Sequence, residues 1–380
     1  FGAHLPYYRL QDIFASSGWT PNRSTLDYIT DLVYEVTQDL PKLMLEELKK
    51  SLCIGVDDTQ VKLIMPKEIP DAESGGDEPQ IQRLIEKMKE AKKANQDSID
   101  AKMWGYSGFD SVAPYDVFDF RVSRHRDGPK ETLVGYEGHA MADCYSGNLH
   151  VILAPDSKMT RMACWSHARR KVYECQHLDR DASTLPLALM NQLYDIERRA
   201  SQRTAEARGE LRKKESQPIL ERLKEFLDGP IVQNVLPSSN LGKAFKYLHN
   251  HWEALNVYVT DGRLPIDNNQ VERLMKRIAI GRKNWLFIGS LREGIRNASL
   301  MSLVSSALRM ELDVSMYLES VITHRLRGTA KLEELLPDRW RAHHPEAVRE
   351  YREQERRDKA DVASLQAAKR RARSELRKKK

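Results

Sequence analysis

Apolar residues recur at helical spacing through the first fifty residues. The pattern predicts helices over residues 7–17 and 23–50, joined by a turn at 17–21 that contains Gly18 and Pro21. Two interpretations of this pair are open, because a helix-turn-helix DNA reader has the same outline as two helices packed on a larger domain. The length and acidic character of the second helix favour the packed pair.

Short apolar runs then predict a β-sheet. The first strand carries Asp57 and Asp58 between two apolar halves, and a polar loop at 70–79 with a charged helix at about 80–95 separates it from the next strand. Three strands in succession, followed by alternation of strands and helices, indicate a mixed sheet in an α/β fold. The predicted strands lie at residues 53–56 continuing into 61–65, 101–106, 115–120, 138–143 and 159–165.

A long helical block follows the strands. From about 176 to 250 the pattern is helical, with breaks at 228–230 and 237–239. A further helix is predicted to begin at residues 267–269 and to stop at Gly281, with Glu272 three residues after Asn269 at the spacing of a capping box. Amphipathic helices are then expected at 300–310 and 314–325.

These patterns divide the chain into successive regions. We expect a helical region at 1–50, a sheet-bearing core in two parts at 51–175 and 251–326, and a helical insertion at 176–250. Residues 327–380 lose apolar periodicity and predict a charged helical or disordered tail that could touch DNA non-specifically.

Composition excludes some classes of protein. No apolar run approaches the ~18 residues of a membrane span, and the N-terminal residues have no basic-then-apolar signal pattern. Four cysteines in 380 residues argue against a disulfide framework. We therefore expect a cytoplasmic protein without membrane contact.

The net charge of +6 is concentrated at one end of the chain. Residues 369–380 contain eight Lys or Arg and one Glu, a net of +7, so the other 368 residues sum to −1. Because the body of the chain is nearly neutral, any nucleic-acid surface must consist of local patches.

Candidate chemistry is densest at residues 261–299. Glu272 falls in the first turn of its predicted helix, and Arg273, Lys276 and Arg277 follow within about one turn. A carboxylate followed by cations suits a site where metal ions meet a phosphodiester backbone. The alternative is that Glu272 caps its own helix and the cations form a solvated face.

A second candidate is the C-x-x-H pair of Cys164 and His167, which leads into a predicted helix. Adding Cys175 and His177 gives a possible zinc set, although C-x₂-H-x₇-C-x-H fits no common structural zinc module well. A buried cysteine and histidine with purely structural contacts remain the other alternative.

Several segments together resemble one protein family. IDNN-x-x-ER at 266–273, followed by GRKNWLF-x-GS at 281–290, resembles the signature of bacterial transposases of the insertion-sequence-66 family, which belong to the DDE group. The similarity covers about residues 4–325. Members typically carry further N-terminal sequence with a zinc-binding region and a coiled coil, so this chain resembles a shortened member. The other matching segments are HLPYYRLQDIF at 4–14, RSTL at 23–26, VDDTQV at 56–61, MADCYSG at 141–147 and CWSHARRKVYE at 164–174.

The resemblance implies an RNase H-like core with an all-α insertion. It also implies metal-dependent DNA cleavage at transposon ends and strand transfer into target DNA, with Asp57, Asp143 and Glu272 holding two Mg²⁺ or Mn²⁺ ions. Asp57 is preferred to Asp58 because VDDT aligns with the family's acid-acid-Thr motif by its first acid. Strand parity agrees weakly, since Asp57 shares a face with Val61 and Leu63.

The resemblance also suggests roles beyond the three acids. Related transposases carry a (C/D)-x-x-H pattern after the second acid, so His167 is expected to orient an acid or contact the scissile phosphate as part of the catalytic site. Trp285 could stack on a flipped or frayed end base, or be buried with its apolar neighbours. The candidates for phosphate contacts are Arg169, Arg170, Lys171, Arg273, Lys276, Arg277, Arg282 and Lys283.

Two other functions share this outline. An RNase H-like nuclease or resolvase would use the same acids, and a non-catalytic DNA-binding derivative would not need them. All three acids are intact, which speaks against the second. From the family alone we expect a nucleoid-associated bacterial protein that acts on DNA as a homo-oligomer, with a dimer as the expected form.

Overall fold

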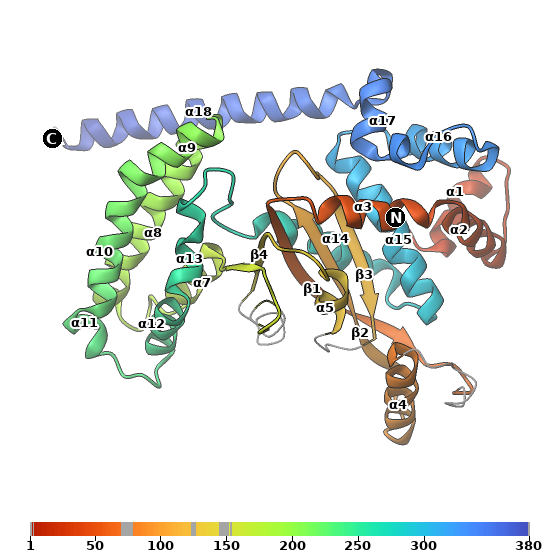
Figure 1. Cartoon of the computed structure of the whole chain (residues 1–380), viewed down its shortest axis with the longest axis horizontal. Helices are drawn as coiled ribbons and strands as arrows, with labels where there is room; N and C mark the ends of the chain where they lie inside the picture. Colours follow the sequence, from red (N-terminus) through yellow and green to blue (C-terminus); the bar gives the residue numbers. More distant parts are fainter. Residues whose placement is uncertain are drawn as a thin grey trace.

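A mixed β-sheet lies at the centre of the molecule (Figure 1). The computed structural model describes residues 2, 4–69, 79–122, 127–143, 152 and 154–378. Within them, five strands form one sheet in the order β3-β2-β1-β4-β5. β1 pairs antiparallel with β2 and parallel with β4, which confirms the predicted mixed sheet. The strands are β1 (Cys53–Ile64), β2 (Ser98–Gly108), β3 (Asp116–Arg121), β4 (His139–Ala142) and β5 (Thr160–Met162).

Helix α14 (Asn269–Trp285) packs closely on one face of β1 and β2. Two glycines allow this approach. A Cβ on Gly55 would lie 2.5 Å from a methyl of Val271, and one on Gly105 would lie 2.1 Å from the terminal methyl of Met275. The residues on this face, including Val61 and Leu63, are buried against the helix. The side of β1 that also carries Asp57 therefore faces α14.

Helix α15 (Leu291–Arg309) protects the edge strand β3. The hydroxyls of Ser302 and Ser306 accept hydrogen bonds from the backbone N–H groups of Phe118 and Asp116, at 2.8 and 2.9 Å. These serines satisfy donors that an edge strand would otherwise present to solvent or to another chain.

Three predicted helix boundaries are wrong. The helix expected over 300–310 already begins at Leu291, because the side chain of Ser290 caps it there by accepting from the backbone N–H of Glu293. The helix expected over 23–50 is divided into α2 (Arg23–Thr37) and α3 (Asp39–Leu48). In a continuous helix, the ring of Pro41 would collide with the carbonyl of Thr37 four residues earlier. The helix expected to stop at Gly281 continues to Trp285 and ends at Leu286, which has φ 63°. A glycine inside a helix costs only about 1 kcal/mol, and a side chain at Gly281 would lie 2.6 Å from Nε1 of Trp285.

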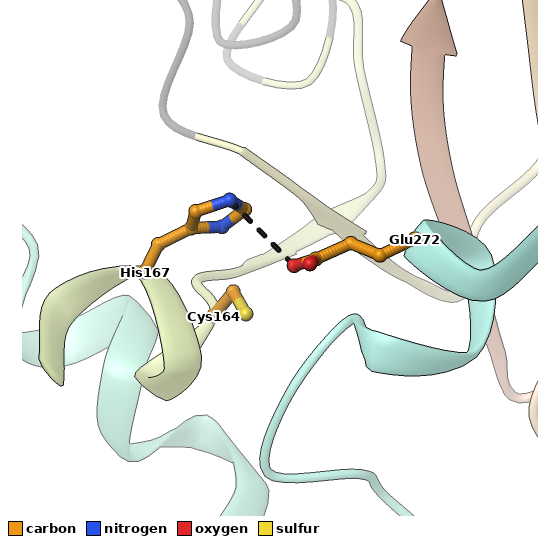
Figure 2. Close-up of side chains that lie close together, drawn as sticks. All are labelled: Cys164, His167 and Glu272. Atoms are coloured by element: carbon orange, nitrogen blue, oxygen red, sulfur yellow. Dashed lines mark ion pairs between the residues drawn. The ribbon is translucent and has the colours of Figure 1, made fainter. Parts of the chain in front are cut away.

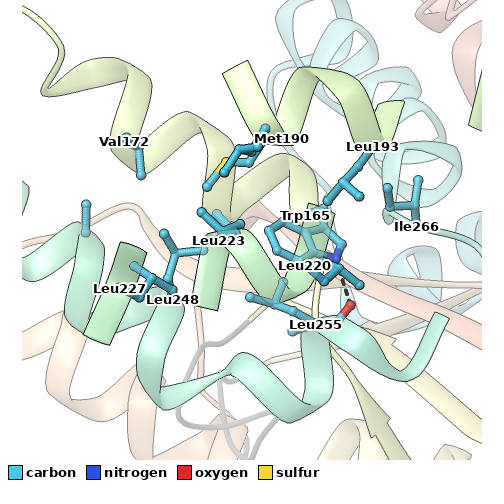
Figure 3. Packing of buried hydrophobic residues seen from close by; sticks show 14 of the residues in the cluster. Trp165, Val172, Met190, Leu193, Leu220, Leu223, Leu227, Leu248, Leu255 and Ile266 are labelled. Carbon is cyan, nitrogen blue, oxygen red and sulfur yellow. Dashed lines mark hydrogen bonds between the residues drawn. The ribbon is translucent and has the colours of Figure 1, made fainter. Parts of the chain in front are cut away.

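A helical block with its own core follows β5 (Figure 3). Trp165 lies at its centre, fully buried, and its indole N–H donates to the carbonyl of Leu255 at 2.7 Å. The predicted breaks are confirmed, since one helix ends at Asp228 and another is capped by Ser239. The elements are α7 (Trp165–Glu174), α8 (Arg180–Ala200), α9 (Ala205–Leu211), the π-helix η1 (Arg212–Ser216), α10 (Gln217–Asp228), α11 (Pro230–Gln233), α12 (Asn240–Asn250), α13 (Trp252–Asn256) and η2 (Val257–Val259).

Helices from both ends of the chain pack on the other side of the sheet. Leu335, Leu336 and Trp340 are buried in the same core as Tyr317, so the packed part of the chain continues past residue 327. The elements not yet named are α1 (Tyr7–Ser16), α4 (Pro79–Lys93), α5 (Asp127–Thr132), α16 (Val314–Arg327), η3 (Leu332–Leu335), α17 (Pro337–His343), η4 (Pro345–Ala347) and α18 (Glu350–Lys378).

Helix α18 is long and mostly exposed, and in Figure 1 it runs from α17 across the top of the view. Its apolar content is low, and among the described residues no helix is both long and apolar enough to cross a bilayer.

Candidate active site

Asp57 lies within β1 on the side that faces α14. Its carboxylate accepts a hydrogen bond from the backbone N–H of Asp58 at 2.9 Å. Burial, together with the negative charges of Asp143, Asp58 and Glu272, raises the pKa of Asp57 to about 7. Asp57 is therefore partly buried and lies near other carboxylates.

Asp143 follows the last residue of β4, where a short strand was predicted to meet a turn. The parallel register pairs Val56 with Ala142, so Asp57 and Asp143 are the next residues on two neighbouring strands. Both line one cavity of about 650 Å³.

Glu272 lies in the first turn of α14, but the predicted capping box is wrong. The N-cap is Asn268, and no side chain caps the helix. Glu272 is therefore the fourth helical residue, one position too far along to reach back to the cap. Its carboxylate instead lies 3.6 Å from Nε2 of His167 and 3.8 Å from the guanidinium of Arg170.

Three acids from distant parts of the chain thus lie near one another, on β1, after the end of β4 and on α14. Asp57 and Asp143 line one cavity, and the charge of Glu272 is close enough to affect the pKa of Asp57. Among the described residues, however, the ligand atoms of these three acids do not form a group within 4.8 Å of one another. Their mutual repulsion contributes to the raised pKa of Asp57, and Oε1 of Glu272 is buried without a hydrogen-bond donor among the described residues. A bound cation would relieve both, since carboxylate oxygens are the preferred ligands of Mg²⁺ and Mn²⁺. The chemistry of these three side chains therefore suits a divalent metal.

Asp58 has a different environment from Asp57. Its carboxylate forms a salt bridge of 2.5 Å with Lys102 on β2, and the two side chains are only 17% and 7% exposed. Sequence reasoning missed Lys102. The available signal was a lysine inside a strand whose other residues are almost all apolar or small. This lysine neutralises Asp58 and also lines the cavity beside Asp57.

The C-x-x-H pair meets the third acid (Figure 2). His167 points from α7 toward Glu272, and Cys164 lies beneath them at the start of the helix. The possible ligand atoms of Cys164, His167 and Glu272 all lie within 4.8 Å of one another. Among the described residues the group does not include Cys175 or His177, so the four-ligand zinc alternative is wrong. Cys175 lies at the opposite end of α7, in the core of the helical block.

The cations of α14 differ in their surroundings. Arg273, Lys276 and Lys283 are exposed, and their spacing of three and seven residues puts them on one face of the helix. Arg277 is partly buried, and burial lowers its pKa. Arg282 lines the cavity with Asp57 and Asp143, and it donates to Oγ1 of Thr59 and to the carbonyl of Gln60.

The cations of α7 already have partners within the chain. Arg169 donates to the side chain of Asn191 at 2.9 Å, and the ammonium of Lys171 lies 4.8 Å from the centre of the Tyr247 ring. Arg170 is paired with Glu272. Trp285 is partly buried against the core below α14, so only part of its ring is open to a nucleic-acid base.

Comparison with known proteins identifies the family. The model described as "Transposase IS66 family" matches residues 1–74 and 77–296, which is well over half of the chain. The chain belongs to the IS66 transposase family. This confirms the family inferred from the motifs, and the mixed sheet is that of an RNase H-like DDE core.

Two relatives of this IS66 family chain come from Sinorhizobium fredii (strain NBRC 101917 / NGR234). The uncharacterized protein y4jD is 30% identical over 354 residues, which cover 90% of this chain and 64% of the relative. The uncharacterized protein y4qI is 26% identical over 348 residues, which cover 88% of this chain and 59% of the relative. The chain thus spans about three fifths of the length of these relatives.

Proposed function

We propose that this chain carries the catalytic centre of a DDE transposase, which cleaves DNA at transposon ends and transfers the strands into target DNA. The observation that supports the proposal is the convergence of Asp57, Asp143 and Glu272, which come from β1, the end of β4 and α14. The raised pKa of Asp57 and the buried oxygen of Glu272 that has no hydrogen-bond partner among the described residues support a cation site over a set of solvated acids.

In this proposal Asp57, Asp143 and Glu272 hold two Mg²⁺ or Mn²⁺ ions. When bound, such ions activate the attacking oxygen and stabilise the leaving oxygen of an in-line displacement at phosphorus. Cleavage uses water and leaves a 3′-hydroxyl, and strand transfer uses that hydroxyl to attack a target phosphate. The Asp57 carboxylate must lose its proton to serve as a ligand, and its pKa of about 7 places this step near neutral pH.

The neighbouring side chains have supporting roles in the proposal. His167, 3.6 Å from Glu272, holds that carboxylate in place. Arg282 at the cavity wall contacts the scissile phosphate, while Lys102 neutralises Asp58 and so prevents a fourth acid from competing for the ions. Arg273, Lys276 and Lys283 bind the phosphate backbone from the exposed face of α14 and position DNA without reading its sequence.

The remaining assignments follow from the family. Residues 176–250 form the all-α insertion between the parts of the catalytic core at 51–175 and 251–326. The active form is a dimer on paired DNA ends, and the protein acts in the bacterial cytoplasm at the nucleoid.

A cleavage and joining assay tests the proposal. Purified protein is incubated with Mn²⁺ and an oligonucleotide that carries a transposon end, and both the nicked strand and its joined product are measured. The Glu272→Gln variant should lose cleavage and keep DNA binding. Cleavage without joining of the 3′-hydroxyl end would favour the nuclease alternative, and equal activity of the variant would remove Glu272 from the mechanism.

A further inference from the structure

The group formed by Cys164, His167 and Glu272 has a chemistry that the acid site alone does not need. It offers one thiol, one imidazole and one carboxylate, with the possible ligand atoms within 4.8 Å of one another (Figure 2). Nε2 of His167 and Oε1 of Glu272 are 3.6 Å apart. This separation is close to the edge of a tetrahedron around an ion with bonds of roughly 2.0–2.3 Å.

The ligand types select for the metal. Mg²⁺ takes oxygen ligands and gains little from a thiol, whereas Zn²⁺ and Co²⁺ bind cysteine, histidine and carboxylate together. Oε1 of Glu272, which faces Nε2 of His167, is also buried with no hydrogen-bond partner in the described part of the chain. An oxygen in this condition is ready to bind a cation.

We propose that a thiophilic divalent cation, Zn²⁺ or its analogue Co²⁺, binds Cys164, His167 and Glu272 and withdraws Glu272 from Asp57 and Asp143. The second half of this statement rests on the proposed function, because it makes the bound ion an inhibitor of the metal-dependent reaction. The first half concerns binding alone and does not depend on activity.

Binding involves the release of one proton. The Cys164 thiol gives up its proton to solvent as the metal–sulfur bond forms. The backbone N–H of Asn268, 3.3 Å from the sulfur, supports the resulting thiolate. Thiolate, carboxylate and a neutral imidazole then balance the two charges of the ion, with a fourth position left for water.

Cobalt absorption tests the binding site directly. The full chain is titrated with Co²⁺, and the thiolate-to-cobalt charge-transfer band is measured. The proteins compared are the wild type, Cys164→Ser, His167→Asn and Cys175→Ser. Cys175→Ser is the matched control, because it changes a buried cysteine at the other end of the same helix. We expect the band in the wild type and in Cys175→Ser, its loss in Cys164→Ser, and at least tenfold weaker binding in His167→Asn. No band in the wild type, or a band that survives Cys164→Ser, would overturn the site. Circular dichroism shows whether each variant is folded.

Zinc inhibition tests the consequence. DNA cleavage is measured at fixed Mn²⁺ with increasing Zn²⁺, and each variant is normalised to its own activity without zinc. The zinc concentration for half-inhibition should be at least tenfold higher in Cys164→Ser than in the wild type or Cys175→Ser. Cobalt binding without this difference would overturn the withdrawal of Glu272. If the wild type showed no cleavage at all, the proposed function would fail while the cobalt experiment still decided the site.

Discussion

The side-chain amide of Asn268 donates a hydrogen bond to the backbone carbonyl of Val56 at 3.0 Å, which fixes the start of α14 beside the residue that precedes Asp57. The backbone N–H of Asn268 also donates to the sulfur of Cys164 at 3.3 Å. One buried asparagine thus connects the three segments that carry Asp57, the C-x-x-H pair and Glu272.

Asn268→Asp should destabilise the protein and reduce DNA cleavage. The substitution removes the donor to Val56 and introduces a charge at a position that is only 1% exposed, and leaving a buried partner unsatisfied costs about 1–3 kcal/mol. The free energy of unfolding, measured with urea, checks the size of the loss. Asn284→Asp is the control, because Asn284 lies near the end of the same helix in an exposed hydrogen bond with Arg9. Equal losses in the two variants would contradict a special role for Asn268.

Asp57→Asn should stabilise the metal-free protein at pH 8. Burial and three neighbouring carboxylates raise the pKa of Asp57 from 3.8 to about 7, so the folded state holds this proton more tightly than the unfolded state does. The stability contribution is therefore present at acidic pH and is lost as pH rises from about 4 through 7. At pH 8 the variant should gain on the order of 1–4 kcal/mol relative to the wild type, from about 1.4 kcal/mol per pKa unit.

Thermal unfolding with and without Mn²⁺ distinguishes the loss of electrostatic repulsion at Asp57 from a non-specific change in stability. Mn²⁺ should raise the unfolding temperature of the wild type at pH 8 and should do so much less in Asp57→Asn, because an ion that binds only the folded state stabilises it. A variant less stable than the wild type at pH 8 would contradict the proposed electrostatic repulsion.

Substitution of the adjacent acid, Asp58, should destabilise the protein, whereas substitution of Asp57 stabilises it. Asp58→Asn leaves the ammonium of Lys102 nearly buried without its anion, and loss of one partner of a buried pair typically costs about 3–5 kcal/mol. Urea unfolding should show this loss, and the double variant Asp58→Leu with Lys102→Met should recover much of it, because an apolar pair replaces the charges. Little change in Asp58→Asn would mean that water already solvates Lys102.

The contrast between Asp57 and Asp58 illustrates which features could be predicted from the sequence. Alternation along β1 placed Asp57 on the face of Val61 and Leu63, and the structure has those two residues buried beneath α14. The strands and the helical block were predictable because each depends on a repeating apolar pattern within one segment. The approximate position of Asp143, at the end of a short strand, followed from the same pattern.

The remaining features depend on contacts between segments that are distant in sequence. The salt bridge of Lys102 with Asp58 requires the pairing of β1 with β2, which a local pattern does not specify. The continuation of α14 through Gly281 is supported by hydrogen bonds from Arg282 to Thr59 and Gln60 on β1, whereas local propensity favoured a stop. Likewise, Glu272 had the spacing of a capping residue, but the burial of Asn268 moved the start of the helix by one residue.

The exposed face of α14 should dominate the salt dependence of DNA binding. Arg273, Lys276 and Lys283 are exposed on one face of the helix. Each phosphate contact that is lost should reduce the slope of log K against log salt by about 0.9 for duplex DNA. We expect the variant with Arg273, Lys276 and Lys283 all changed to Gln to bind all DNA sequences more weakly and to the same extent. Its slope should fall by two to three times the value of about 0.9 per phosphate contact, as measured by fluorescence anisotropy. The control is Lys224→Gln in the helical block, where the lysine is paired with Asp228 at 2.6 Å. An unchanged slope in the triple variant, or an equal change in the control, would place the DNA on another surface of the protein.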